Sequence, residues 1–185
     1  RDARFHSKFI VRGDLPLESL ADLKAQAANL TFTFGSESST SGHLMPRYFL
    51  EQEGIDPDND FRSLPNFSGS HDLTWKLVAS GAFDAGALNE EVWARAVRDG
   101  KVDPRKVKVF YTTPEYFDYN WTVQGNLEQI YGSGFTEKIR SALLALNPRE
   151  HSEILELFSA DRFISSQNSN YRDIEDVARS LGIIR

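Results

Sequence analysis

Residues 36–42, with the sequence SESSTSG, place four serines and a threonine directly in front of an apolar periodic stretch. One hydroxyl side chain is enough to cap a helix, so the remaining hydroxyls need another role. Backbone N–H groups at a helix start bind anions, and the hydroxyls of Ser39, Thr40 and Ser41 would add donors. The alternative is an N-cap with a solvated loop, because hydroxyl-rich turns are common. The lysine of a GxxxxGK[ST] phosphate loop is absent.

A second strand-to-helix turn, residues 67–72 with the sequence FSGSHD, combines glycine, serine and an imidazole. His71 could donate to the same anion if both turns meet at the carboxyl edge of a sheet, where open α/β folds bind ligands. The alternative is that Ser70 caps a helix and His71 lies at the surface in its first turn.

A third junction, residues 83–91 with the sequence FDAGALNEE, ends a short strand with small residues that leave room for another group. Asn89, Glu90 or Glu91 could then face a ligand. The alternative is that Asn89 caps the following helix and the two glutamates complement its dipole.

Catalytic and metal-binding patterns are not found in the sequence. Residues 56–61 resemble the start of a calcium loop, but Phe61 and Phe67 stand where the loop needs glycine and glutamate. The four histidines lack the spacing of metal ligands, and zero cysteines exclude thiolate sites and cysteine nucleophiles. There is no G-x-S-x-G elbow. We therefore expect no enzyme activity, no metal and no cofactor.

Composition is that of an ordinary soluble domain, with 40% apolar and 26% charged residues among 185. The 21 basic and 27 acidic residues give a net charge of −6, which argues against a nucleic-acid partner. No apolar run approaches the roughly 20 residues of a membrane helix. The chain begins with Arg1 rather than Met, so we expect a trimmed chain.

Strand-like and helix-like segments alternate along the chain, which predicts an α/β protein with a parallel or mixed sheet covered by helices. We expect strands over residues 5–13, 30–35, 61–67, 83–88, 107–113 and 120–125. We expect helices over residues 17–26, 43–53, 71–81, 89–100, 136–146, 150–159 and 171–181.

The motifs also occur in a specific order: SLADL, STSG with a following proline, GSHD, DAGA, TTPEYFDYNWTVQGNL and finally YRDIEDVARSLGI. This ordered set resembles the phosphonate, phosphite and phosphate solute-binding proteins of bacterial ABC transporters, over essentially the whole chain. The resemblance implies the type II periplasmic-binding-protein fold, in which two α/β lobes are joined by two crossing strands and hold the ligand between them.

The resemblance also implies roles for individual residues. Ser39, Thr40 and Ser41 would hold the phosphoryl oxygens at a helix N-terminus, and His71 would bind the same group. Glu91 matches, by spacing, the acid that reads the amino end in aminoalkylphosphonate binders. Tyr119, or its neighbour Asp118, falls near a second such position, where a tyrosine weakens the case for an amine-bearing ligand.

The resemblance predicts an incomplete pair of lobes. Family members usually carry a further N-terminal segment, and this chain begins near the strand that leads into the second lobe. We therefore expect residues 14–114 to form that complete lobe, with the anion-binding turns. Residues 1–13 and 115–185 would form part of the first lobe, with the C-terminal helices.

The expected function is capture of a phosphonate, phosphite or phosphate and its delivery to the membrane subunits of an ABC permease. The protein would work in the periplasm, or outside the cytoplasm as a membrane-anchored lipoprotein. A different class is an extracytoplasmic sensing domain of a signalling protein with the same fold. An enzyme acting on phosphonates is a third, but it needs a metal set or an activated nucleophile.

Overall fold

A five-stranded mixed sheet is the central element of the computed structural model, which describes residues 3–158 and 160–185. The strand order is β3–β2–β4–β1–β5. Strands β2 and β3 are parallel, as are β2 and β4, whereas β1 is antiparallel to both β4 and β5. The strands are β1 (Ser7–Arg12), β2 (Phe32–Phe34), β3 (Asn66–Phe67), β4 (Ala85–Asn89) and β5 (Val107–Thr112).

The chain divides into two compact units. The sheet unit comprises Ala3–Asp118 and Tyr171–Arg185, and the helical unit comprises Tyr119–Asn170. Helices of the sheet unit are α1 (Leu20–Gln26), α2 (Met45–Gln52), α3 (His71–Ala79), α4 (Glu90–Arg98) and α8 (Arg172–Ser180). Those of the helical unit are α5 (Leu127–Tyr131), α6 (Phe135–Leu144) and α7 (Ser152–Leu157).

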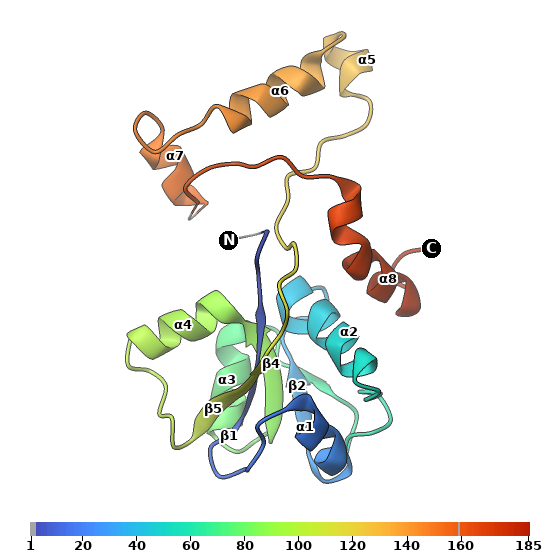
Figure 1. Cartoon of the computed structure of the whole chain (residues 1–185), viewed down its shortest axis with the longest axis vertical. Coiled ribbons are helices and arrows are strands. Elements are labelled where there is room, and N and C mark those ends of the chain that lie inside the picture. The colour runs from blue at the N-terminus through green and yellow to red at the C-terminus, as the bar shows by residue number, and fades with distance from the viewer. Residues whose placement is uncertain (1–2, 159) are drawn as a thin grey trace. The chain divides into compact units, whose positions relative to one another are not determined.

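Helices cover both faces of the sheet, and β1 shows how the sequence produces this. Phe9 and Val11 point into a core shared with α1 and α2, whereas Ile10 points into a second core shared with α3 and α4. All three side chains are fully buried. Successive residues of a strand face opposite sides, so a strand buried on both faces is apolar throughout. Figure 1 shows α1 and α2 on one side of the sheet and α3 and α4 on the other.

Gly86 lets three elements come close together in the middle of the sheet. A Cβ atom at this position of β4 would lie 2.7 Å from the carbonyl oxygen of Thr33 in β2 and 3.1 Å from the Cγ2 of Thr74 in α3. Only glycine leaves that space free, so it allows β2 and α3 to pack directly against β4.

Asp84 lies just before β4, at the end of the sheet where β4 begins, and binds groups from two other strand ends. Its buried carboxylate accepts hydrogen bonds from the backbone N–H and hydroxyl of Thr31, at 2.8 and 2.9 Å, and from Arg12 at 2.8 Å. Arg12 ends β1 and Thr31 precedes β2. One carboxylate therefore satisfies donors from the ends of β1 and β2, the two strands that flank β4.

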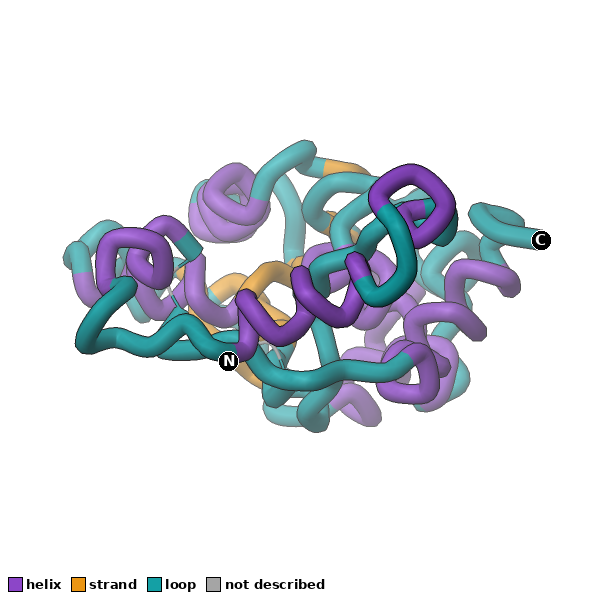
Figure 2. The backbone as a smooth tube through the Cα atoms, turned by 90° about the horizontal axis from the view of Figure 1, so that it is seen from above, coloured by secondary structure: helices purple, strands orange, loops and turns teal. Residues whose placement is uncertain are grey.

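The helical unit is held by local contacts. The carboxylate of Glu128 accepts hydrogen bonds from the backbone N–H groups of Gly134, Phe135 and Thr136, and so caps the start of α6. Trp121 packs edge-on against Phe158 at a centroid distance of 5.1 Å, and against Phe163 at 5.3 Å. Outside the sheet, helices and loops make up the backbone (Figure 2).

Most elements expected from the sequence are present, often with shorter limits, and the α/β class is confirmed. The strand expected over residues 120–125 is wrong, because that stretch is a loop without ladder pairing. Helix α5 was not expected. The helix expected over residues 150–159 is α7, and residue 159 lies outside the described residues. No helix within the described ranges is both long and apolar enough to cross a bilayer.

We predict that Asp84→Ala lowers the free energy of unfolding of the sheet unit by about 1–3 kcal/mol, since it leaves the buried N–H of Thr31 without an acceptor. Glu175→Ala, which removes only an exposed ion pair with Arg179 on α8, should cost about 0.3–0.5 kcal/mol. Urea unfolding followed by circular dichroism measures both. Equal losses for the two variants would show that Asp84 has no special role.

Candidate functional site

The serine turn, residues 36–44, leads from β2 into α2 through a single π-helical turn, Thr40–Leu44. Ser39 is its N-cap, and its hydroxyl oxygen accepts a hydrogen bond from the N–H of Gly42 at 3.0 Å. The backbone N–H groups of Thr40 and Ser41 have no acceptor among the described residues. A π-turn of this kind is frequent at functional sites. The two N–H groups are therefore available to an anion at the helix start.

Ser41 is fixed from two directions. Its backbone carbonyl accepts a hydrogen bond from the hydroxyl of Ser7 in β1 at 2.7 Å. The Ser7 oxygen in turn lies 2.7 Å from the hydroxyl of Tyr116. The Ser41 side chain is buried, with its oxygen 3.4 Å from the Nδ2 of Asn89.

The histidine turn, residues 67–71, leads from β3 into α3. Ser70 caps the helix by accepting a hydrogen bond from the N–H of Leu73 at 3.2 Å. The Nδ1 of His71 accepts one from the backbone N–H of Asn89 at 3.3 Å. Its ring packs against Gly42, where a Cβ atom would lie 2.8 Å from the ring Cε1.

The two turns therefore converge at the carboxyl ends of the parallel strands β2, β3 and β4. Asn89, the last residue of β4, touches both Ser41 and His71. Its Oδ1 also caps α4 by accepting from the N–H groups of Glu91 and Val92, at 2.8 and 3.1 Å. The expected cap at Asn89 is present, but its contacts with the other two turns could not be predicted from the local pattern.

A buried network lies beside the serine turn. The Nδ1 of His43 lies 2.6 Å from the carbonyl oxygen of Glu37, and its Nε2 accepts a hydrogen bond from Arg47 at 3.1 Å. Arg47 also pairs with both carboxylate oxygens of Asp58, at 2.9 and 3.1 Å. The buried guanidinium is therefore already bound by Asp58, and this network joins the turn to α2.

Burial lowers the pKa of His71, with a smaller opposing effect of Asp72. Burial also lowers the pKa of His43, where Arg47 adds to the shift and the carbonyl of Glu37 opposes it. Both imidazoles are therefore neutral at pH 7.

The remaining residues singled out in the sequence lie in different places. Thr40 is half-buried in the serine turn, and Glu91 is half-buried in the first turn of α4. Tyr119 is 63% exposed and begins the helical unit. The sheet unit thus brings together Ser39, Ser41 and His71.

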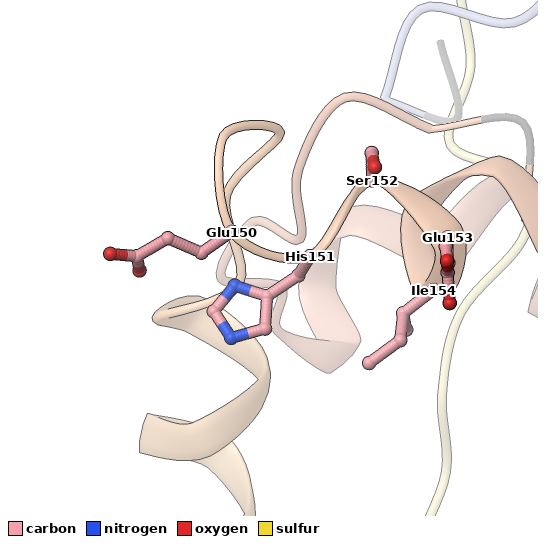
Figure 3. Close-up of a pocket in the computed structure, with 5 residues that line it drawn as sticks. All are labelled: Glu150, His151, Ser152, Glu153 and Ile154. Carbon is pink, nitrogen blue, oxygen red and sulfur yellow. The ribbon is translucent and has the colours of Figure 1, made fainter.

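A separate shallow hollow of about 320 Å³ lies in the helical unit. Figure 3 shows the residues that line it, Glu150–Ile154, at the start of α7. It includes none of the residues singled out in the sequence. No cluster of three or more metal-ligating side chains occurs in the part of the chain that the structure describes.

Comparison with known proteins gives a match over residues 1–171 to the family described as ABC transporter, phosphonate, periplasmic substrate-binding protein. The chain is 45% identical to the probable ABC transporter phosphite binding protein PhnD1 of Prochlorococcus marinus, over the whole chain and 63% of that protein. It is 29% identical to the phosphonates-binding periplasmic protein of Escherichia coli, over 60% of the chain and 32% of that protein. The chain thus spans less than two thirds of these relatives.

The structure is similar to that of PhnD1 from Prochlorococcus marinus in complex with methylphosphonate, with a TM-score of 0.82 and 44% identity over 99% of this chain and 69% of the other. XAC2383 from Xanthomonas citri, bound to ATP, has a TM-score of 0.68 at 22% identity over 98% of this chain and 67% of that protein. The second likeness concerns the fold alone.

We predict that stability falls as the pH drops below 6.5, the ordinary pKa of histidine. The unfolded chain then binds protons that the folded chain, with two lowered histidine pKa values, does not. Each histidine contributes at most about 1.4 kcal/mol per pH unit. Urea unfolding between pH 8 and pH 5 measures the slope, and His43→Gln and His71→Gln should each reduce it. An unchanged slope in both variants would contradict the assignment.

We also predict that Gly42→Ala displaces the His71 ring, because the new Cβ would lie 2.8 Å from its Cε1. The ring resonances of His71 should shift in nuclear magnetic resonance spectra. Gly125→Ala, where a Cβ would meet no atom within 4 Å, is the control and should leave them unchanged. A Gly42→Ala spectrum identical to that of the parent would show that the contact is not tight.

Proposed function

The chain belongs to the family of periplasmic substrate-binding proteins of phosphonate ABC transporters, and we propose that it carries the anion-binding lobe of a receptor for a small phosphonate or phosphite. This family is a class of transporter component rather than of enzyme. Membership also implies a location outside the cytoplasm. We propose that the protein is either free in the periplasm or held at the membrane by a lipid anchor.

The observation that carries the proposal is the convergence of neutral donors at the edge of the sheet. The free N–H groups of Thr40 and Ser41, the buried hydroxyl of Ser41 and the imidazole of His71 all belong to two turns joined by Asn89. Oxyanions are stabilised by such donors without a neighbouring cation, since the helix start adds its positive dipole end. The hydroxyls of Ser39 and Thr40 would complete the set.

The ligand class is proposed from the relatives. One is named a phosphite binding protein, and its structure contains methylphosphonate. We propose that this protein binds such a ligand and delivers it to the membrane permease subunits of its transporter. Glu91 would contact an amino group if the ligand carried one, and Tyr119 would lie near the organic part.

The lobe assignment remains our proposal: residues 14–114 as one complete lobe, and residues 1–13 and 115–185 as part of the other. Two features of the sheet unit support it. Strands β1 and β5 run antiparallel beside each other, and a further bridge joins Phe5 to Tyr116. The segments that enter and leave the sheet are therefore neighbours, as two crossing strands require.

Ser41→Ala and His71→Ala should each weaken the binding of methylphosphonate by the natural protein about 10- to 150-fold, the effect of losing one hydrogen bond to a charged group. Calorimetric titration with methylphosphonate and with phosphite measures this. The melting temperature should change little, since neither substitution opens a large apolar cavity. Parent-like binding in both variants would mean that the turns only cap helices.

Glu91→Gln separates two ligand types. A carboxylate attracts an amino group and repels a bare anion, so the variant should bind 2-aminoethylphosphonate more weakly and methylphosphonate equally or better. Titration of parent and variant with both ligands is the measurement. A loss for methylphosphonate alone would remove Glu91 from the proposed site.

A further inference from the structure

Asn89 contacts both Ser41 and His71, the side chains that we propose to bind the anion. It is not among the residues to which the family resemblance assigns a role. We propose that Asn89 is a positioning residue that forces Ser41 and His71 to present hydrogen-bond donors to the ligand. This inference rests on the proposed function. It explains why the site would accept anion oxygens that carry no proton.

The orientation of the Asn89 amide follows from its hydrogen bonds. Its Oδ1 accepts from the N–H groups of Glu91 and Val92 at 2.8 and 3.1 Å. Both of those groups can only donate, so the oxygen of the amide must face α4. The Nδ2 then faces the hydroxyl oxygen of Ser41, at 3.4 Å.

This orientation decides whether the Ser41 hydroxyl donates or accepts in its hydrogen bond with Asn89. An amide NH₂ group only donates, so the hydroxyl of Ser41 accepts from Asn89 and keeps its own proton free. The side chain has no other hydrogen-bond partner among the described residues. Ser41 is only 2% exposed, so its proton needs an acceptor, which the anion would provide.

The backbone of Asn89 decides which ring nitrogen of His71 carries the proton. Its N–H donates to Nδ1 at 3.3 Å, so Nδ1 carries no proton. In the neutral ring the proton is then on Nε2, which can only donate. Gly42 and Gly35 lie against the same ring, where added Cβ atoms would come within 3.1 and 3.4 Å of Nδ1. The ring is therefore held in place as well as in one tautomer.

Two substitutions separate this role from that of a helix cap. Asn89→Asp keeps a good N-cap but replaces the donating NH₂ by an acceptor. That acceptor would take the proton of Ser41 and add a negative charge, so affinity for methylphosphonate should fall by roughly 100-fold or more. Asn89→Ser also caps α4 but removes the contact without adding charge, and the expected loss is roughly 3- to 10-fold.

A double-mutant cycle in the natural protein tests whether Asn89 acts through Ser41. In the Ser41→Ala background, Asn89→Ser should cause no further loss of methylphosphonate affinity. Nuclear magnetic resonance of ¹⁵N-labelled protein should show an unprotonated Nδ1 and a protonated Nε2 for His71 at neutral pH. Additive losses in the cycle, or a proton on Nδ1, would overturn the inference.

The same measurements distinguish a failure of the proposed site from a failure of the positioning role of Asn89. If Ser41→Ala and His71→Ala leave methylphosphonate binding unchanged, the proposed site itself is wrong. If those variants weaken binding while Asn89→Ser does not, the site stands and only the positioning role of Asn89 is wrong. Melting temperatures close to that of the parent show that the substitutions at position 89 retain the cap.

Discussion

The close approach of β2 and α3 to β4 at Gly86 is the constraint on which the candidate site depends. Without a side chain at this position, the backbone of Thr33 and the side chain of Thr74 pack directly against β4. The two strands are parallel, so their carboxyl ends lie at the same edge of the sheet. The serine turn follows one strand and Asn89 ends the other. A larger residue at Gly86 would separate the elements that bring these groups within hydrogen-bonding distance.

The charges of the groups near the site depend on how those groups are buried and paired. The buried arginine nearest the serine turn, Arg47, is bound to Asp58 and His43, and the histidine that faces Asn89 is neutral because burial lowers its pKa. The serine and histidine turns would therefore offer an anion the partial charges of N–H and O–H groups. Such donors are directional, and they discriminate by geometry more than by total charge.

Much of the fold could be predicted from the sequence because its signals are local. Alternating apolar residues, glycine stops and hydroxyl or amide caps identified nearly every strand and helix of the sheet unit. The failure at residues 120–125 has the same origin: Trp121 and Val123 alternate with polar residues, but the described residues of the helical unit include no strand with which they could pair. The double contact of Asn89 is not local. It joins residues 18 and 48 positions away, and only the strand register decides it.

The hydroxyl of Ser7 gives the serine turn a connection beyond the site. It donates its proton to the carbonyl of Ser41, so the Tyr116 hydroxyl must donate to it in return. Ser7 begins β1 and Tyr116 follows β5, the two segments through which the chain enters and leaves the sheet. A shift of the serine turn would therefore strain the two hydrogen bonds of the Ser7 hydroxyl. A movement of either segment would strain the same bonds. One hydroxyl oxygen therefore joins the start of the proposed anion-binding helix to both of the segments that lead into and out of the sheet.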